Sequence, residues 1–343
     1  MRGNQMTRLS VDLNAICDGF EIGIPQGTPQ PVTGGLLHRM WCLETDHGRF
    51  AIKVLNSEIM SRPDAKTNYR MSERVAHQAN IKGIRAVSAR TVDRQPWIEL
   101  HGEYVMVFDW VDGITLLPEN CTSEHVKHIG EILFQIHNLD IVIDGSALPT
   151  FSAISFDTWR YHIENARRDA SCWGLSCESI LQDVTNWSRK YQDAVDNLPQ
   201  KFVISHRDLD SKNVIWNHEG IPYLIDWESA GYIHPTVELV EVAFNWSRSH
   251  DGTVSKERFQ GVIQAYLEAG GTLHSEVLDA VYGSFGGMLG WLEYNMRRSL
   301  NRDLFNMDDR ELGRREVIHT LQELEKLSQA VSDYANWMAE VYG

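Results

Sequence analysis

The sequence predicts an α+β fold with two lobes, a small antiparallel β-rich lobe followed by a larger, mainly helical lobe. Two observations support this prediction. Residues 31–113 show the order strands, one helix, strands, and most of the later chain has the apolar spacing of helices, interrupted by a strand pair around residues 202–226. Gly113 ends the β-rich part. We therefore expect an N-terminal lobe over residues 1–113 and a C-terminal lobe over residues 114–343.

The N-terminal lobe begins with a short amphipathic piece that carries Leu9, Leu13 and Ile16, followed by a stretch rich in Gly and Pro. Apolar runs on both sides of the turn sequence DHGR then indicate antiparallel strands. The expected elements are two or three strands over 32–45 and 50–55, a helix over 64–84 that ends near Gly83, and two strands over 96–113 with a turn at His101–Gly102. The helix would pack on the small sheet.

Helical spacing is clearest over residues 123–139, where one helix face carries apolar residues at 126, 129, 132, 133 and 136. Ser123, with a Glu in the first turn, is a suitable cap for this helix. Further helices are expected over 156–170, 178–197 and most of the chain from 236 onwards.

The composition is ordinary for a soluble enzyme, with 43% apolar and 23% charged residues. The first residues contain no continuous apolar segment, and no apolar run approaches about 18 residues, so we expect no signal peptide, no membrane span and a cytoplasmic protein. The five cysteines lack CxxC spacing. A disulfide or metal site at the closest pair, Cys172 and Cys177, stays open, but reduced thiols fit better.

The charge of the chain is unevenly distributed. Residues 1–113 contain 13 Lys and Arg and 13 Asp and Glu, whereas residues 114–343 contain 19 and 34, so the later part carries the whole net charge of −15. An acidic surface repels nucleic acid and attracts cationic small molecules. Solubility alone is the other explanation of this excess.

A polar stretch, SHRDLDSKNVIW at residues 205–216, precedes a predicted hairpin. NVIW and YLID are short runs of β-forming residues separated by the turn sequence NHEG. Asn213 begins the first run and Asp226 ends the second, so both side chains are expected at the same end of the pair, with Asp208 on the preceding loop. Amide and carboxylate oxygens suit Mg²⁺. We therefore predict that Asn213 and Asp226 bind Mg²⁺ and that Asp208 acts on a hydroxyl.

These residues resemble the motifs of known kinases. HRDLDSKN resembles the H-R-D-x-x-x-x-N catalytic loop of the protein-kinase-like fold, and IDWE, in place of D-F-G, resembles the aminoglycoside phosphotransferase family and its small-molecule kinase relatives. FAIKVL resembles the V-A-I-K strand, TGGLLHRM a nucleotide-positioning loop and YVMVFDWVDG a hinge strand. The resemblance covers roughly residues 31–250 and implies a protein-kinase-like, two-lobed fold.

The resemblance also implies a site for phosphoryl transfer, with Mg²⁺ as cofactor and ATP or GTP as phosphate donor. The implied residues are Asp208 as the base for the acceptor hydroxyl, Asn213 and Asp226 as Mg²⁺ ligands, Lys53 as the phosphate lysine, Glu73 as its ion-pair partner, Gly34 and Gly35 in the nucleotide loop, and the backbone of Asp109 and Val111 at the nucleobase. His206 is expected to support the loop by hydrogen bonds.

The sequence departs from the related patterns in several places. There is no GxGxxG loop and no A-P-E after Asp226, and both absences argue against a protein kinase. Arg207 is typical of protein kinases, whereas aminoglycoside phosphotransferases commonly have a small residue there. Asp210 is also unusual; it would either contact a cationic substrate or pair with Lys212, and we slightly favour the pairing.

The acidic excess favours a cationic acceptor, because carboxylates bind ammonium groups through charge-assisted hydrogen bonds. The stretch GGMLGWLEYNMRRSL, residues 286–300, carries Trp291, Glu293 and Tyr294 on one predicted helix. An aromatic ring beside a carboxylate suits an ammonium group. A core helix with Glu293 on its solvated side is the more ordinary explanation.

Together these patterns predict a kinase that transfers the γ-phosphate of ATP or GTP to an alcohol group of a small cationic molecule, with an aminoglycoside or similar antibiotic as the leading acceptor. One alternative is a metabolic kinase for choline, an amino sugar, homoserine or thiamine. Another is a non-catalytic nucleotide-binding protein, against which the presence of Lys53, Asp208, Asn213 and Asp226 argues. No nucleic acid, membrane or protein partner is expected.

Overall fold

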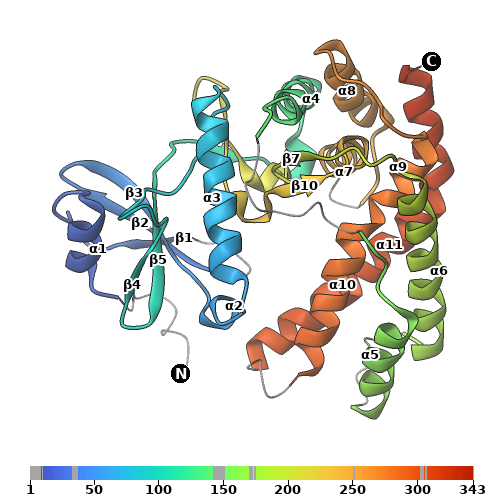
Figure 1. The fold of residues 1–343 in the computed structure, drawn as a ribbon, viewed down its shortest axis with the longest axis horizontal. Helices are drawn as coiled ribbons and strands as arrows, with labels where there is room; N and C mark the ends of the chain where they lie inside the picture. Colours follow the sequence, from blue (N-terminus) through green and yellow to red (C-terminus); the bar gives the residue numbers. More distant parts are fainter. Residues whose placement is uncertain are drawn as a thin grey trace. The chain divides into compact units, whose positions relative to one another are not determined.

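The structure is a computed structural model that describes residues 9, 11–32, 38–141, 151–169, 173, 175–249, 252–301, 305 and 307–342. Its internal contacts divide the chain into two units (Figure 1). The first unit comprises Met1–Leu117, Leu139–Asp144 and Ile204–Gly231, and the second comprises Pro118–Asn138, Gly145–Val203 and Tyr232–Gly343. The catalytic-loop motif therefore belongs to the same unit as the N-terminal sheet. The predicted division at residue 113 stays a prediction.

The first unit contains a five-stranded antiparallel sheet with the strand order β1-β2-β3-β5-β4. Its strands are β1 (Gln30–Val32), β2 (Arg39–Thr45), β3 (Gly48–Val54), β4 (Ile98–Leu100) and β5 (Glu103–Asp109). Phe50, Ile52 and Val54 of β3 join one apolar cluster, whereas Leu55 joins a second cluster. Because side chains alternate between the faces of a sheet, Lys53 lies on the face of the second cluster, directly opposite Met106 in the register.

Helices cover the two faces of this sheet (Figure 1). α1 (Leu13–Phe20) contributes Ile16 and Phe20 to the first apolar cluster and is capped by Asp12, whose carboxylate accepts two backbone N–H groups. After the short α2 (Ser57–Met60), α3 (Ala65–Ile81) contributes Tyr69 to the second cluster. The predicted helix over 64–84 is thus confirmed with slightly shorter bounds, and it lies on the face that carries Lys53.

A second, three-stranded sheet with the order β6-β8-β9 carries the predicted hairpin. Its strands are β6 (Ile114–Thr115), β8 (Val214–Trp216) and β9 (Pro222–Leu224). The hairpin is confirmed, although Asn213 ends a preceding 3-10 turn, η2 (Ser211–Asn213), and Asp226 lies beyond the end of β9. Gly113 allows β6 to approach β8, since a Cβ there would lie 2.3 Å from the Trp216 carbonyl oxygen. β7 (Val203–Ser205) and β10 (Gly231–Ile233) form a two-stranded sheet.

The second unit is mainly helical. Its elements are η1 (Pro118–Asn120), α4 (Ser123–His137), α5 (Phe156–Arg168), α6 (Cys177–Asn197), α7 (Pro235–Ser247), α8 (Lys256–Glu268), α9 (Val277–Gly283), α10 (Phe285–Leu300) and α11 (Met307–Tyr342). The predicted cap of α4 at Ser123 is wrong. Thr122 is the N-cap, because it exchanges hydrogen bonds with His125 in a capping box.

Further observations concern the cysteines, membrane-spanning helices and metal-binding groups. Cys17, Cys42 and Cys121 are not disulfide-bonded. Cys177 is disulfide-bonded, which corrects the expectation of a reduced thiol there. Cys172 lies outside the described residues. Within the described ranges, none of the helices is both long and apolar enough to cross a membrane. The same ranges contain no group of three or more His, Cys, Asp and Glu side chains suited to a metal ion.

Candidate active site

The loop His206–Asp210, which the motif predicted to be catalytic, connects β7 to η2 and is held by a buried imidazole. His206 is completely buried, and its Nε2 donates a hydrogen bond to the Ile225 carbonyl oxygen at 2.9 Å. Its Nδ1 accepts the Asp208 N–H at 3.3 Å, so the ring is the Nε2–H tautomer. The Trp227 indole packs against the ring, with the centroids 4.5 Å apart. His206 therefore joins the loop to the segment before Asp226, in a supporting position.

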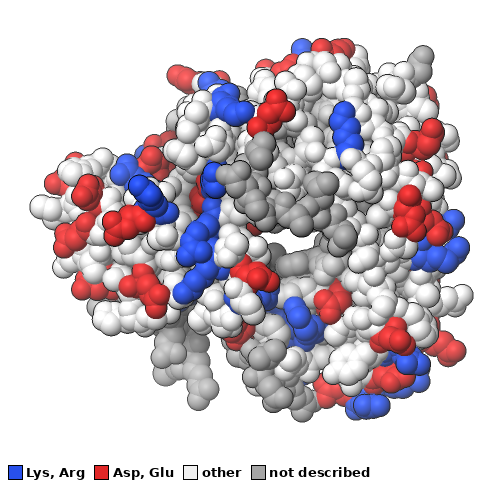
Figure 2. Space-filling view, viewed as in Figure 1, with Lys and Arg blue, Asp and Glu red and all other residues white. Residues whose placement is uncertain are grey.

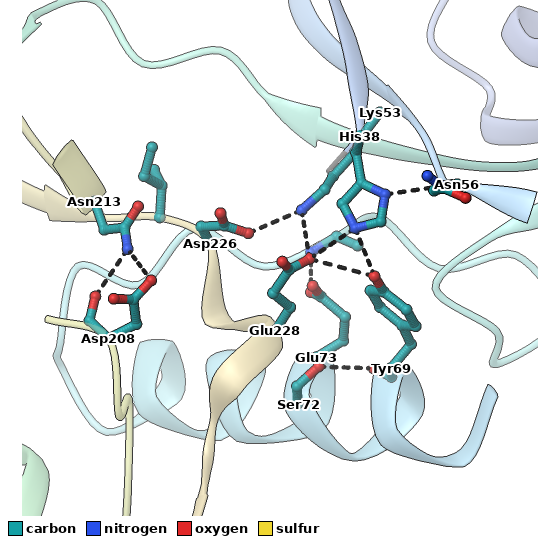
Figure 3. A network of polar contacts seen from close by, with 12 residues as sticks. His38, Lys53, Asn56, Tyr69, Ser72, Glu73, Asp208, Asn213, Asp226 and Glu228 are labelled. Carbon is teal, nitrogen blue, oxygen red and sulfur yellow. Dashed lines mark hydrogen bonds and ion pairs between the residues drawn. The ribbon is translucent and has the colours of Figure 1, made fainter. Parts of the chain in front are cut away.

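Asp208 is fixed by Asn213, five residues later. The Asn213 Nδ2 donates to both the backbone carbonyl and the Oδ2 of Asp208, each at 2.8 Å. Figure 3 shows that this contact turns the Asn213 amide oxygen away from Asp208. Burial raises the pKa of Asp208, against the opposing charge of Lys212, whose Nζ lies 3.6 Å from Oδ2. The loop thus presents an oriented carboxylate whose affinity for a proton is higher than that of an exposed aspartate.

Asp226 begins the 3-10 turn η3 (Trp227–Ser229) in a left-handed conformation, with φ 59° and ψ 58°. Aspartate adopts this conformation more readily than most residues. The turn directs the carboxylate towards β3, where Oδ1 accepts a hydrogen bond from Lys53 Nζ at 2.8 Å (Figure 3). The side chain is 37% exposed, so it has room for a second partner.

Lys53 is buried between two carboxylates. Its Nζ donates to Asp226 Oδ1 and, at 3.0 Å, to Glu228 Oε2. Burial alone would lower the pKa of Lys53, but the negative charges of Asp226 and Glu228 outweigh it and raise the pKa above its usual range. The lysine therefore remains a cation, which is the form that binds phosphate oxygens.

The implied ion pair between Lys53 and Glu73 is not formed. Among the contacts of the described residues, Glu73 Oε2 accepts the Ala89 N–H at 2.7 Å, while Lys53 bonds to the two carboxylates that follow β9. Burial raises the pKa of Glu73 to about 7, although the Ala89 N–H and the charge of Lys53 lower it. Glu73 has its own backbone partner, and the η3 turn brings Asp226 and Glu228 to Lys53. Lys53 therefore pairs with these two carboxylates and not with Glu73. Its role towards the nucleotide stays a prediction.

Three residues of this site were not identified from the sequence: Glu228, His38 and Tyr69. Glu228 is the last letter of the IDWE motif, and Tyr69 lies one helical turn before Glu73, on the same face of α3. Tyr69 Oη contacts both His38 Nε2, at 2.7 Å, and Glu228 Oε2, at 3.3 Å. Although burial acts to raise the pKa of Glu228, the charge of Lys53 and the hydrogen bond from His38 hold it below its usual range. The spacing on α3 is the one signal that could have indicated Tyr69.

The other described residues that were predicted in the first unit have partners outside the Lys53 group. Asp109 ends β5, and its exposed carboxylate accepts a hydrogen bond from Arg90 Nε at 2.8 Å. Val111 follows in the same segment and is half-buried, while Gly34 and Gly35 lie outside the described residues. Asp210 caps η2 by accepting the Lys212 N–H, and its carboxylate lies 3.8 Å from Lys212 Nζ. This contact is the pairing that the sequence favoured for Asp210.

In the second unit, Glu293 of α10 has a partner on α5. Its Oε1 lies 2.8 Å from His162 Nε2, and this hydrogen bond lowers the pKa of the Glu293 carboxyl. Trp291 and Tyr294 stack with their centroids 5.5 Å apart, and the Trp291 indole donates to Glu316 at 3.2 Å. α10 thus carries Glu293 together with two stacked aromatic rings, and Glu316 of α11 contacts one of these rings. A role of Glu293 towards a substrate stays a prediction.

The donors around Asp226 have the chemistry that Mg²⁺ requires. Mg²⁺ prefers one or two protein oxygens and fills its remaining positions with water and phosphate oxygens. Asn213 has committed its NH₂ group to Asp208, which leaves its amide oxygen for a cation, and Asp226 is an ionisable carboxylate with an exposed edge. The residues present therefore fit a magnesium ion.

The comparison with known proteins agrees with this geometry. A model of the phosphotransferase enzyme family matches residues 28–271. The chain belongs to this family. The match confirms the resemblance to aminoglycoside phosphotransferases that the HRDLDSKN and IDWE motifs indicated. A search of curated proteins finds no match to this phosphotransferase.

Solved structures confirm the protein-kinase-like fold. The phosphotransferase is similar to a spectinomycin phosphotransferase in complex with ADP and spectinomycin, with a TM-score of 0.69, 13% identity and coverage of 94% of this chain and 99% of that chain. An ethanolamine kinase from Plasmodium vivax has a TM-score of 0.60 at 13% identity, covering 93% and 86%. An aminoglycoside phosphotransferase from Alicyclobacillus acidocaldarius has a TM-score of 0.60 at 12% identity, covering 97% and 99%. At these identities the likeness concerns the fold.

Proposed function

We propose that this phosphotransferase is a small-molecule kinase that transfers the γ-phosphate of ATP or GTP to a hydroxyl group. One observation carries the proposal: a buried lysine and carboxylates suited to phosphoryl transfer lie in one unit of the chain. A buried cation, Lys53, is 2.8 Å from the carboxylate of Asp226, and Asp208 is locked by Asn213. Proteins that transfer phosphoryl groups mainly position reactants and neutralise charge, and these groups serve both purposes.

Each group has a defined part in the proposed reaction. Asp208 would accept a hydrogen bond from the acceptor hydroxyl, orient its oxygen towards the γ-phosphorus and take the proton; its raised affinity for a proton suits this task. Lys53 would contact the phosphate oxygens of the donor. Asn213 and Asp226 would hold Mg²⁺, which neutralises phosphate charge when bound. Arg207 lies in a left-handed conformation, with φ 63°, directly before Asp208, so the loop carries strain at the reacting position.

The nucleotide site is proposed from the same unit. The stretch around Gly34 and Gly35 would cover the phosphates. The backbone of Asp109 and Val111 would contact the nucleobase, since Asp109 ends β5 and Val111 follows two residues later. Glu73 is proposed as a residue near Lys53, the lysine that would contact the phosphates. Neither ATP nor GTP is favoured by these contacts.

The proposed acceptor is a small cationic molecule, with an aminoglycoside or similar antibiotic as the first candidate. The excess of Asp and Glu in residues 114–343 supports a cation, as does the pairing of carboxylates with stacked rings near Glu293. Asp210 has Lys212 as a neighbour and contributes less to this argument. A metabolic amino-alcohol kinase is the second candidate, and the similarity to an ethanolamine kinase from Plasmodium vivax supports it.

The test is phosphate transfer from ATP and from GTP across aminoglycosides, other basic antibiotics and amine or amino-alcohol metabolites. Product masses identify the phosphorylated molecule, and Asp208→Asn, assayed in parallel, separates transfer by this protein from transfer by contaminants. Turnover on an antibiotic, with resistance in expressing cells, supports the first candidate. Turnover only on a metabolite supports the second. Absence of nucleotide binding in the presence of Mg²⁺ contradicts the proposal as a whole.

A further inference from the structure

We propose that His38 and Tyr69 are positioning residues that hold Glu228 against Lys53, so that Glu228, and not the carboxylate of helix α3, keeps the phosphate lysine in place during nucleotide binding. This inference rests on the proposed kinase function. It concerns three residues from separate parts of the first unit: His38 directly before β2, Tyr69 on α3 and Glu228 on η3 (Figure 3).

The hydrogen bonds of this group have a defined direction. The Asn56 N–H donates to His38 Nδ1 at 3.0 Å, so the neutral ring carries its proton on Nε2. That Nε2 lies 2.7 Å from Tyr69 Oη and 3.2 Å from Glu228 Oε2, so its single proton is shared between the two oxygens. Tyr69 then directs its own hydroxyl proton to Glu228 Oε2. Together with Lys53, three donors therefore converge on one carboxylate oxygen.

Burial makes this arrangement costly to break. The His38 side chain is 4% exposed and Tyr69 is 7% exposed. Removing the hydrogen-bond partner of a buried polar group destabilises a protein more than removing that of an exposed group, because water does not replace the buried partner. Lys53, Tyr69 and His38 all contact the same oxygen of Glu228. Glu228 is thus an immobilised partner for Lys53.

The two carboxylates that hold Lys53 differ in their exposure and in their other proposed partners. Asp226 is more exposed than Glu228, 37% against 23%, and it is also the proposed Mg²⁺ ligand. A carboxylate that binds a divalent cation is a weaker partner for a lysine, because the cation draws its negative charge. When Mg²⁺ occupies Asp226, the position of Lys53 will depend mainly on Glu228, and therefore on His38 and Tyr69.

The first experiment compares Tyr69→Phe with Tyr104→Phe. Both changes remove one hydroxyl from a tyrosine of the same apolar cluster and keep the ring, but Tyr104 has no part in the Glu228 group. We expect Tyr69→Phe to raise KM for the nucleotide about ten- to hundredfold, the effect of losing a hydrogen bond to a charged group, while KM for the acceptor stays unchanged. Tyr104→Phe should match the wild type in both constants.

Nucleotide titration with and without Mg²⁺ gives a reading that does not depend on turnover. Without metal, Asp226 still holds Lys53, so Tyr69→Phe should bind ADP nearly as well as the wild type. With Mg²⁺, its affinity should fall by the same factor as KM rises. An equal loss under both conditions, or none under either, would overturn the inference.

Two substitutions of His38 separate positioning from packing, should Tyr69→Phe fold poorly. In His38→Asn the side-chain oxygen replaces Nδ1 and keeps the Asn56 contact, but nothing reaches Glu228. In His38→Gln the longer amide places an NH₂ group near the former Nε2. We expect Gln to restore nucleotide affinity and Asn not to; the reverse order contradicts the proposal. If the wild type binds no nucleotide, both the proposed kinase function and the positioning role are contradicted. If the wild type binds nucleotide and the variants bind it equally well, only the positioning role is contradicted.

Discussion

Replacing Glu73 by Gln is expected to stabilise the protein at alkaline pH and to change its stability little at acidic pH. Burial raises the pKa of Glu73 from 4.5 to about 7, against the lowering effects of the Ala89 N–H and Lys53. The fold therefore favours the protonated carboxyl, whose stabilising contribution is complete below pH 4.5 and is lost as the pH rises through about 7. At about 1.4 kcal/mol per pH unit, the difference amounts to about 3 kcal/mol of unfolding free energy at most. In the Glu73→Gln variant the side-chain amide is neutral at every pH, and its oxygen still accepts the Ala89 N–H.

Urea denaturation over a pH series measures this difference. The unfolding free energies of the wild type and of Glu73→Gln should separate steadily with rising pH and then run parallel above the pKa of Glu73. Glu99→Gln is a matched control, because Glu99 is an exposed carboxylate on β4. Parallel curves throughout the series would refute the reasoning. A variant that is less stable at alkaline pH would show that Glu73 is ionised and paired with Lys53, as the kinase resemblance implied.

Three further predictions concern the reaction and the fold. Asp208→Asn keeps an acceptor for the Asn213 amide, so we expect normal nucleotide binding with kcat about a hundred- to ten-thousandfold lower; turnover within about tenfold of the wild type contradicts the role of Asp208 as base. Asp226→Ala should abolish Mg²⁺-dependent nucleotide binding in a calorimetric titration, and unchanged binding removes Asp226 from the metal site. Gly130→Ala should destabilise the protein by about 1–2 kcal/mol in chemical denaturation, because its Cβ would lie 2.4 Å from the Val262 carbonyl oxygen. Gly290→Ala, a helical position with open space, should instead stabilise it by about 0.5–1 kcal/mol, and equal effects would contradict the packing argument.

Much of the fold was predictable because local patterns specify it. Alternation along FAIKVL indicated a strand, and its register opposite Met106 explains why Lys53 points towards α3. The β8–β9 hairpin was predicted from its turn composition. The cap of α4 was predicted one residue late, because the box formed by Thr122 uses a histidine where Glu or Gln is usual. Propensity rules do not detect such a partner.

The charge of the surface also illustrates this limit. The even balance of residues 1–113 hides a local asymmetry, since Figure 2 shows Lys and Arg side chains following α3 along its exposed side. Lys66, Arg70 and Arg74 recur every four residues on that helix, whereas its one carboxylate, Glu73, points inward. Counting charges over a lobe averages such a stripe away, and helical spacing must be applied to each element to find it.

For the site as well, sequence motifs predict some features and tertiary contacts decide the others. Motifs predicted that Lys53 and Asp226, 173 residues apart, belong to one site. They implied that the lysine pairs with Glu73, whereas it pairs with Asp226 and Glu228. The motifs miss this choice because it depends on small differences in reach and in alternative partners. Glu73 has the Ala89 N–H available, while Glu228 gains His38 and Tyr69 only in the folded chain. As a result, Glu73 on α3 can hold a proton, whereas Glu228 on η3 keeps its charge. Coupling between pH and the position of Lys53 should therefore be weak, since the group that titrates near neutrality is not the group that holds the lysine.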